Sequence, residues 1–365
     1  MATLHIFNPD HDIALAANLA NFTAPHAGRQ LRNDLGFLPL LWAAEDDVVL
    51  VDNVEAAEKA SRRLRSRWGL TGCRFVGSHQ LTDMAIDGIA PWGWDLALQA
   101  LLKRQGVSEK LLPDAEQLEQ VRQLSHRRTA AALLEQLQGD DGIVGEAYEC
   151  GSLEEVETLL ARFGQVVMKA PWSSSGRGVR FCDAAHLDER GETGLGKWVC
   201  NVIARQGSIM VEPYYQKVKD FGMEFEATDE GIRYLELSLF HTRNGAYMGN
   251  VLATEQAKLD MISCYIPECL LHSVRQNVVQ WLDLGDYRGP FGVDMMVVRG
   301  DGETEDGSCR LHPCVEINLR RTMGHVALAA GRLFNPTADD DIQGVMHVVY
   351  NGTNYQLKII KLKSR

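Results

Sequence analysis

The sequence predicts a mixed protein in which a small parallel α/β unit precedes a larger α+β part. In the N-terminal third, short apolar runs alternate with helical segments, an order that is typical of a parallel sheet. In the middle of the chain, residues 165–181 read as strand, Ser/Gly loop and strand. Near the C-terminal end, residues 289–298 and 310–320 are two strands joined by a polar, glycine-rich loop, which predicts an antiparallel hairpin.

The composition is that of a globular protein of ordinary polarity. Of 365 residues, 45% are hydrophobic and 24% charged, and the length is enough for two or three domains. The net charge of −12 disfavours nonspecific binding to nucleic acid or to anionic membranes, so neither is expected as a partner. The first residues lack the basic and apolar regions of a signal peptide, so we expect none, and the eight cysteines form no CxxC pair. We therefore expect a cytoplasmic protein whose thiols pack as small core residues.

The N-terminal unit is predicted from the alternation of strands and helices. Its elements are a strand at 4–7, a helix from Ile13, a strand at 48–52, a helix at 55–69 and a second half from 73–77 to 90–106. Two capped helices follow. The first covers 124–139 with Ser125 as its N-cap, and the second covers 152–164, where Ser152 and Glu155 have the spacing of a capping box. Strands are then expected at 208–215 and over 222–254, and a helix over 269–285.

One face of the strand around residue 317 carries three polar side chains. Val315, Ile317 and Leu319 alternate with Glu316, Asn318 and Arg320, so that a buried face opposes a polar one. Asp294 lies in the preceding strand, and same-face residues on paired strands are about 5 Å apart. Two carboxylates and an amide oxygen suit Mg²⁺, and without a cation they would repel each other. The alternative is a solvated sheet face with an ordinary Glu–Arg pair.

A loop of small residues follows the strand that ends at Lys169. Backbone N–H groups of such a loop can approach an anion, and serine hydroxyls add donors. The sequence is neither a Walker loop nor a dinucleotide fingerprint, because it leads into a strand. A flap over phosphates is one interpretation and a plain hairpin is the other. The candidate residues are Ser173, Ser174, Ser175, Gly176 and Gly178.

The strand Ile209–Tyr215 has features of an adenine-binding edge. The Pro213 carbonyl can accept from an amino group, and the Tyr215 N–H can donate to a ring nitrogen. Glu212 can hydrogen-bond the sugar or the base. A buried core strand is the alternative.

The order of these motifs resembles the ATP-grasp superfamily over roughly residues 115–335. The order is Arg127 or Arg128 on a helix, Lys169 with its loop, the Glu212–Tyr215 strand, Asp294, and Glu316-x-Asn318-x-Arg320. The resemblance implies the ATP-grasp fold, in which two α+β lobes enclose ATP, behind a Rossmann-like pre-ATP-grasp unit. It implies domains at 1–112, which could hold a substrate, at 113–209 with the phosphate loop, and at 210–365 with the metal site.

The resemblance also implies a role for each matched residue. Lys169 contacts the α-phosphate, and residues 173–178 cover the β- and γ-phosphates. Apart from the resemblance, Lys217 and Lys219 follow the adenine-binding edge and could reach phosphate or be solvated, and we expect Lys219 to be solvated. Asp294, Glu316 and Asn318 bind one or two Mg²⁺ ions, with Mn²⁺ as an alternative, and Arg320 faces the transferred phosphate. The superfamily usually has lysine where this chain has Arg127, which keeps the charge.

The implied function is an ATP- and Mg-dependent ligase. It would activate a small-molecule carboxylate as an acyl phosphate and join it to an amine or thiol, with charge neutralisation as the main catalytic need. The alternatives are a small-molecule kinase on the same scaffold and a non-catalytic nucleotide-binding protein.

Two polar segments are candidates for holding the carboxylate and amine substrates. In parallel α/β sheets ligands lie at the carboxyl ends of strands, although Asp10 or Asp12 could simply cap a helix. The segment 240–250 is the second candidate, with a surface hairpin as its alternative. The residues expected to contact substrate are Asn8, Asp10, His11, Asp12, His241, Arg243 and Arg321, with Arg29 as a weaker candidate.

Overall fold

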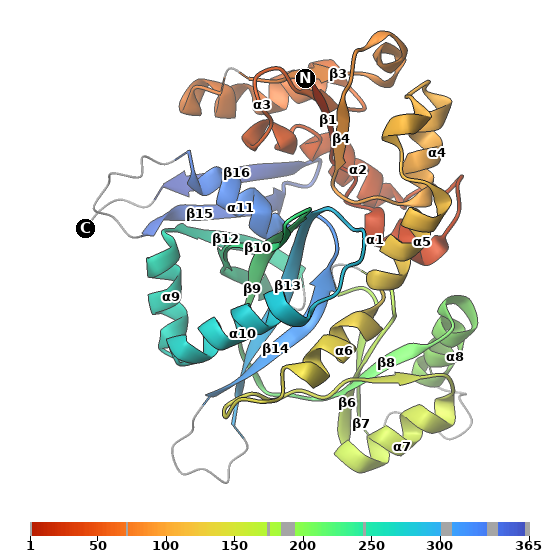
Figure 1. Cartoon of the computed structure of the whole chain (residues 1–365), viewed down its shortest axis with the longest axis vertical. Helices are drawn as coiled ribbons and strands as arrows, with labels where there is room; N and C mark the ends of the chain where they lie inside the picture. The colour runs from red at the N-terminus through yellow and green to blue at the C-terminus, as the bar shows by residue number, and fades with distance from the viewer. Residues whose placement is uncertain are drawn as a thin grey trace.

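The computed structural model describes residues 2–70, 72–173, 176–183, 194–243, 246–300, 309–333 and 342–361. Within these ranges the strands form four sheets of four strands each. Figure 1 shows a parallel unit at one end of the molecule, a small lobe at the other end, and a larger two-sheet body between them. No helix of the described residues is long and apolar enough to cross a membrane.

The N-terminal unit is a parallel sheet flanked by helices, as predicted. Its strand order is β3-β2-β1-β4, and all three pairings are parallel. The strands are β1 (Thr3–Ile6), β2 (Val48–Leu50), β3 (Arg74–Val76) and β4 (Gly88–Pro91). The helices are α1 (His11–Ala17), α2 (His26–Leu35), α3 (Val54–Trp68) and α4 (Leu96–Arg104). Asp95 caps α4 by accepting a hydrogen bond from the Leu98 N–H at 2.9 Å.

The small lobe is an antiparallel sheet with order β5-β8-β6-β7. Its elements are β5 (Tyr148–Cys150), α7 (Leu153–Phe163), β6 (Gln165–Lys169), β7 (Val179–Asp183), α8 (Gly194–Gln206) and β8 (Ile209–Pro213). Apolar residues of the two helices and the sheet share one core. Ser152 caps α7 as predicted, accepting from the Glu155 N–H at 3.2 Å.

The predicted helix 124–139 corresponds to the shorter helix α6, and Ser125 is not its N-cap. Helix α5 (Ala115–Leu124) ends at Ser125, and α6 (Arg127–Gln136) begins after His126. The His126 Nδ1 atom accepts a hydrogen bond from the Arg128 N–H at 3.0 Å, so the imidazole serves as the cap. The Ser125 hydroxyl instead donates to the Val121 carbonyl within α5 at 2.7 Å.

The large body consists of two antiparallel sheets, with orders β10-β9-β13-β14 and β11-β12-β15-β16. The strands are β9 (Lys217–Thr228), β10 (Gly231–Ser238), β11 (Phe240–Arg243), β12 (Ala246–Ala253), β13 (Gly289–Arg299), β14 (Cys309–Asn318), β15 (Ile342–Tyr350) and β16 (Tyr355–Lys361). The helices are α9 (Glu255–Ser263), α10 (Glu268–Trp281) and α11 (Met323–Gly331). A parallel unit ahead of two α+β lobes is the predicted fold class, which is thereby confirmed.

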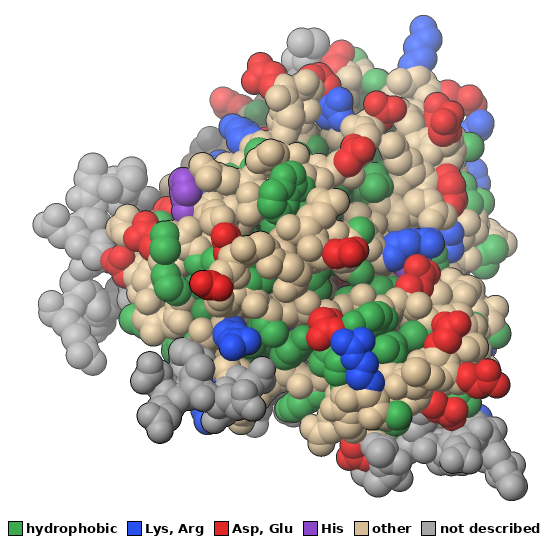
Figure 2. Space-filling view, turned by 60° about the horizontal axis from the view of Figure 1, so that its bottom comes forward, with side chains coloured by type: hydrophobic (Ala, Val, Ile, Leu, Met, Phe, Trp, Pro, Cys, Tyr) green, Lys and Arg blue, Asp and Glu red, His purple; other side chains and the backbone are tan. Residues whose placement is uncertain are grey.

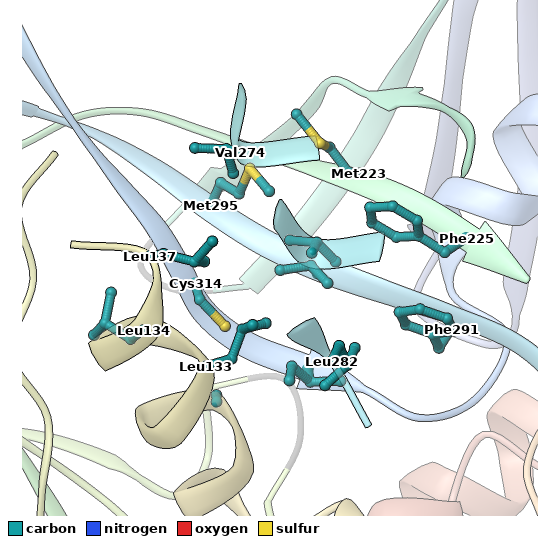
Figure 3. Packing of buried hydrophobic residues seen from close by; sticks show 14 of the residues in the cluster. Leu133, Leu134, Leu137, Met223, Phe225, Val274, Leu282, Phe291, Met295 and Cys314 are labelled. Carbon is teal, nitrogen blue, oxygen red and sulfur yellow. The ribbon is translucent and has the colours of Figure 1, made fainter. Parts of the chain in front are cut away.

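The main core lies between the β9–β13–β14 sheet and helices α6 and α10. Figure 3 shows Leu133 and Leu134 of α6, and Leu137 just after it, in one cluster with Cys314 and Met295 of the sheet. A separate core joins the N-terminal unit to α11 and to strands β12, β15 and β16. Strand β8, at 209–213, belongs to the small-lobe sheet. The boundaries at 112 and 209 remain predictions.

The Phe225–Phe291 stack tests this core. The two rings are fully buried, with centroids 5.1 Å apart. We expect Phe225→Ala to lower the free energy of unfolding by about 3–5 kcal/mol, because it removes apolar contacts and leaves a cavity. Val279→Ala on the exposed side of α10 is the control and should stay within about 0.5 kcal/mol of wild type. Urea unfolding followed by circular dichroism measures both, and equal effects would contradict the assignment of Phe225 to the core.

Candidate functional site

A pocket of about 720 Å³ lies between the small-lobe sheet and the β9–β13–β14 sheet. It is lined by residues of α6, β6, β8, β9, β11, β13 and β14, which are far apart in the sequence. Most of the predicted nucleotide and metal residues meet here. Those in the lining are Arg127, Lys169, Gly176, Glu212, Pro213, Tyr215, Lys217, His241, Asp294 and Glu316.

The pairing of β13 with β14 brings the predicted metal ligands together. Asp294 lies directly opposite Glu316, and Gly292 lies opposite Asn318, so these side chains share one face. The Asn318 amide donates to Asp294 Oδ2 at 3.1 Å. Burial, with the nearby Glu316 and Glu224 carboxylates, raises the pKa of Asp294 to about 8. A positive charge at this position would remove most of that penalty.

Glu224 is a third acid on this face that the sequence analysis missed. It lies on β9 opposite Gly292, and its carboxylate accepts from the Thr322 hydroxyl at 2.8 Å and contacts His325 Nδ1 at 2.9 Å. A Cβ atom on Gly292 would lie 2.7 Å from Glu224 Oε2, so the glycine makes room for the acid. The alternation of Gly222, Glu224 and Glu226 along β9 is the only sequence signal for it.

The donor set fits Mg²⁺ bound together with phosphates. Among the described residues, no group of three or more His, Cys, Asp or Glu side chains converges as a closed metal cage. Mg²⁺ commonly takes one or two carboxylates and completes its shell with water and substrate phosphates. Asp294 and Glu316 supply two carboxylates at the pocket wall, and the burial of Asp294 beside Glu316 is the observation that favours a cation here.

Arg127 reaches the pocket, whereas Arg128 lies at the surface. The Arg127 Nη2 atom is 2.8 Å from Glu316 Oε1, and its Nε donates to the Ala170 carbonyl at 3.1 Å. Arg128 instead pairs with Gln123 and Glu149. The Arg127–Glu316 ion pair therefore joins the start of α6 to the predicted metal strand.

The opposite wall carries a buried Lys169–Glu212 ion pair at 2.5 Å. Pro213 follows Glu212 in the pocket lining, and the Tyr215 ring packs edge-on against His312 with centroids 5.6 Å apart. Lys217 pairs with Asp220 at 2.6 Å. Lys219, which we expected to be solvated, also lines the pocket, and burial lowers its pKa.

The apolar part of the pocket was not predicted. Val167 and Phe181 from the small lobe and Met296 and Val315 from the large body supply it. Phe181 is 65% exposed and packs edge-on against Tyr214, with ring centroids 5.9 Å apart.

Only part of the predicted phosphate loop is described by the structure. The Ser173 hydroxyl lies 3.5 Å from Arg127 Nη2, and Gly178 packs so closely on Ser173 that a Cβ atom would lie 2.3 Å from the serine Cβ. Gly178 is therefore required for the loop to turn back on itself. Ser174 and Ser175 lie outside the described residues.

Arg320 does not line the pocket but is held by Asp12 of the N-terminal unit. Its Nε and Nη2 atoms donate to the Asp12 carboxylate at 2.9 and 2.8 Å, and Nη2 also donates to Asn318 Oδ1 at 2.8 Å. Burial works against the charged form of Asp12, yet Arg320 holds the pKa of that carboxyl below its usual value. Asp12 thus contacts the predicted metal strand.

The other predicted substrate residues are dispersed. Asn8 and His11 are buried and hydrogen-bond to the turn before α4, where both contact Asp95. Asp10 stands at the start of α1 without capping it, and lines a separate small pocket with Arg29. Arg321 lies over the Trp42 ring at 4.5 Å, and burial lowers its pKa to about 10. The side chain of Arg243 lies outside the described set.

No protein-family model and no curated protein matches this chain. Solved structures are similar to it. One is the N5-carboxyaminoimidazole synthetase of Staphylococcus aureus complexed with ADP, with 14% identity and a TM-score of 0.49 over 96% of this chain and 83% of that chain. Another is the biotin carboxylase domain of Hydrogenobacter thermophilus 2-oxoglutarate carboxylase with MgADP, with 14% identity and a TM-score of 0.48 over 95% and 75%. At such values the similarities assign no activity to this chain.

The cap of α6 gives a pH test of the element that positions Arg127. Burial, aided by Arg128, lowers the pKa of His126 to about 4 from 6.5. The unfolded chain therefore takes up a proton before the native state does, and stability is lost as the pH falls from about 6.5 toward 4. The variant His126→Asn retains a capping oxygen but has no titrating imidazole. We expect it to lose about 2 kcal/mol less of its free energy of unfolding than wild type over this pH range.

Urea titrations of both proteins at pH 7.5, 6 and 5 measure the effect. Wild type should approach or fall below the variant at pH 5. Parallel pH profiles of the two proteins would show that His126 is not the group responsible. His79→Asn, at an exposed position of the N-terminal unit, is the matched control.

Proposed function

We propose that this chain is an ATP- and Mg-dependent ligase that activates a small-molecule carboxylate as an acyl phosphate and joins it to an amine or thiol. The observation that supports this most strongly is the composition of the larger pocket. One wall offers a buried Lys–Glu pair beside a proline-containing strand, and the other offers paired carboxylates. A nucleoside triphosphate needs a base-binding edge and a cation site, and the residue types on these two walls support both assignments.

In this proposal the base occupies the apolar part of the pocket. Val167 and Phe181 cover one side of it and Met296 the other, while the Pro213 carbonyl and the Tyr215 N–H read the adenine edge. Lys169 is fixed by Glu212 so that its ammonium can contact the α-phosphate. The phosphates then extend toward Gly176 and Arg127.

The acidic end of the pocket would hold the metal through Asp294, Glu316 and Asn318. When bound, Mg²⁺ neutralises the phosphate oxygens, and Mn²⁺ can take the same oxygen donors. Arg127 supplies a fixed positive charge at the same place, because the Ala170 carbonyl and Glu316 orient its guanidinium. Loose phosphoryl transfer depends on such positioning and charge more than on a protein nucleophile.

The proposed chemistry has two steps. A carboxylate oxygen of the substrate attacks the γ-phosphorus, the bond to the β,γ-bridging oxygen breaks, and ADP leaves. The amine then attacks the acyl carbon, inorganic phosphate leaves, and the amine loses a proton. In this proposal Arg320, whose guanidinium donates to both Asp12 and Asn318, faces the acyl phosphate. His241, which lines the pocket, is proposed to face one of the substrates.

Neutralising the carboxylate pair tests the metal assignment. We expect Glu316→Gln and Asp294→Asn each to lower Mg-ATP turnover at least 100-fold, because each replaces a negatively charged metal ligand with a neutral amide. Phosphate release and ADP formation measure turnover. Glu226→Gln is the matched control, since Glu226 lies on the same sheet but pairs with Arg233 outside the pocket. Turnover within threefold of wild type in Glu316→Gln would remove Glu316 from the metal site.

The identity of the products separates a ligase from a kinase. We expect a screen of carboxylates and amines with Mg-ATP to release ADP and inorganic phosphate in equal amounts, and only when both substrates are present. A stable phosphorylated product without free phosphate would instead indicate a kinase. If Mg-ATP does not raise the melting temperature, and no substrate pair yields ADP, a nucleotide-dependent enzyme is ruled out.

A further inference from the structure

We propose that the N-terminal unit holds a second anion site, which takes a compact oxyanion such as a phosphate or carboxylate group. The site is a pocket of about 190 Å³ between α2, α4 and the segment after β1. As far as the described residues go, it shares no lining residue with the larger pocket. The inference does not depend on the proposed ligase activity.

Three arginines converge on this pocket. Arg29 and Arg32 are three residues apart on α2 and therefore lie on the same side of that helix, while Arg104 comes from the end of α4. Arg32 pairs with Asp52 at 3.2 Å, and the described part of the chain offers Arg29 and Arg104 no carboxylate within ion-pair distance. Such a concentration of guanidinium groups in a chain with a net charge of −12 favours an anion.

The two acids in the lining do not neutralise these arginines. Asp95 is occupied by the Leu98 N–H at 2.9 Å and the Asn8 amide at 3.2 Å, and it also contacts His11. Asp10 has an oxygen, Oδ1, that is buried and has no hydrogen-bond partner among the described residues. Burial raises the pKa of Asp10, and the nearby Arg32 works against that shift.

The position of the pocket also suits an anion. Asn8 and Asp95 follow β1 and β4, so the pocket lies at the carboxyl ends of parallel strands, where ligands of α/β sheets bind. Ala97 and Leu98 in the first turn of α4 line it, which places the positive end of that helix dipole at the site. The volume is well below the roughly 300 Å³ at which drug-sized ligand pockets begin, so a single small anionic group fits and a nucleotide does not.

Helix α1 connects the site to the end of β14. Asp10 precedes this helix, and Asp12 in its first turn holds Arg320. An oxyanion that contacts Asp10 therefore lies two residues from the Asp12–Arg320 ion pair. Arg320 follows β14, which carries Glu316 and Asn318, so α1 links the small pocket to the strand that borders the larger one.

Calorimetric titration of the full chain with inorganic phosphate, and separately with succinate, tests the inference. We expect at least one of the two anions to bind, and the double variant Arg29→Ala/Arg104→Ala to weaken that binding at least tenfold. The anion that binds more tightly shows whether the site prefers a phosphate or a carboxylate group. The double variant Arg62→Ala/Arg74→Ala, at exposed positions of the same unit, is the matched control and should bind as wild type does.

Phosphate could also enter the larger pocket, so Lys169→Met is titrated in parallel. Binding that survives Lys169→Met and is lost in Arg29→Ala/Arg104→Ala supports the second site. Binding that follows Lys169 instead, or the absence of heat with both anions at millimolar concentration, would overturn it. Unchanged far-UV circular dichroism of the arginine variants keeps the result separate from misfolding.

Discussion

The antiparallel register of β13 and β14 is the constraint on which the larger pocket depends. In this register Asp294 and Glu316 are direct neighbours, while Val293 and Ile317 face the core behind them. A slip of one residue would turn the acids into the core and the apolar residues into the pocket. The core residues therefore fix the register, and the register forces two carboxylates together. Burial first, and the nearby Glu316 second, raise the pKa of Asp294, and a cation at this position would offset both effects.

Helix α6 serves the core and the pocket at the same time. Leu133, Leu134 and Leu137 anchor it on β14 and its neighbours, and Arg127 at its first turn enters the pocket. Because the helix is held by its apolar side, the guanidinium reaches Glu316 without needing a flexible loop. The His126 cap and the Ala170 carbonyl restrict Arg127 further.

The N-terminal unit is joined to this arrangement at two places. Asp12 binds Arg320, which follows β14, and α11 packs against both large-body sheets and the N-terminal core. In Figure 1, strands β15 and β16 lie beside the N-terminal helices, although these strands come at the opposite end of the sequence. Figure 2 shows acidic and basic side chains interspersed with apolar ones on the face that it draws.

The sequence by itself determined the elements and much of the larger pocket. The alternation around Ile317 placed Glu316 and Asn318 on one face, the serine–glycine run located the loop after Lys169, and strand–helix alternation gave the parallel unit. Only the tertiary structure revealed Glu224, the His126 cap, and the pairing of Asp12 with Arg320 across 308 residues. The reason is physical. Side-chain alternation is set by a strand's own geometry and can be read locally, whereas contacts between distant segments depend on how separate cores pack together.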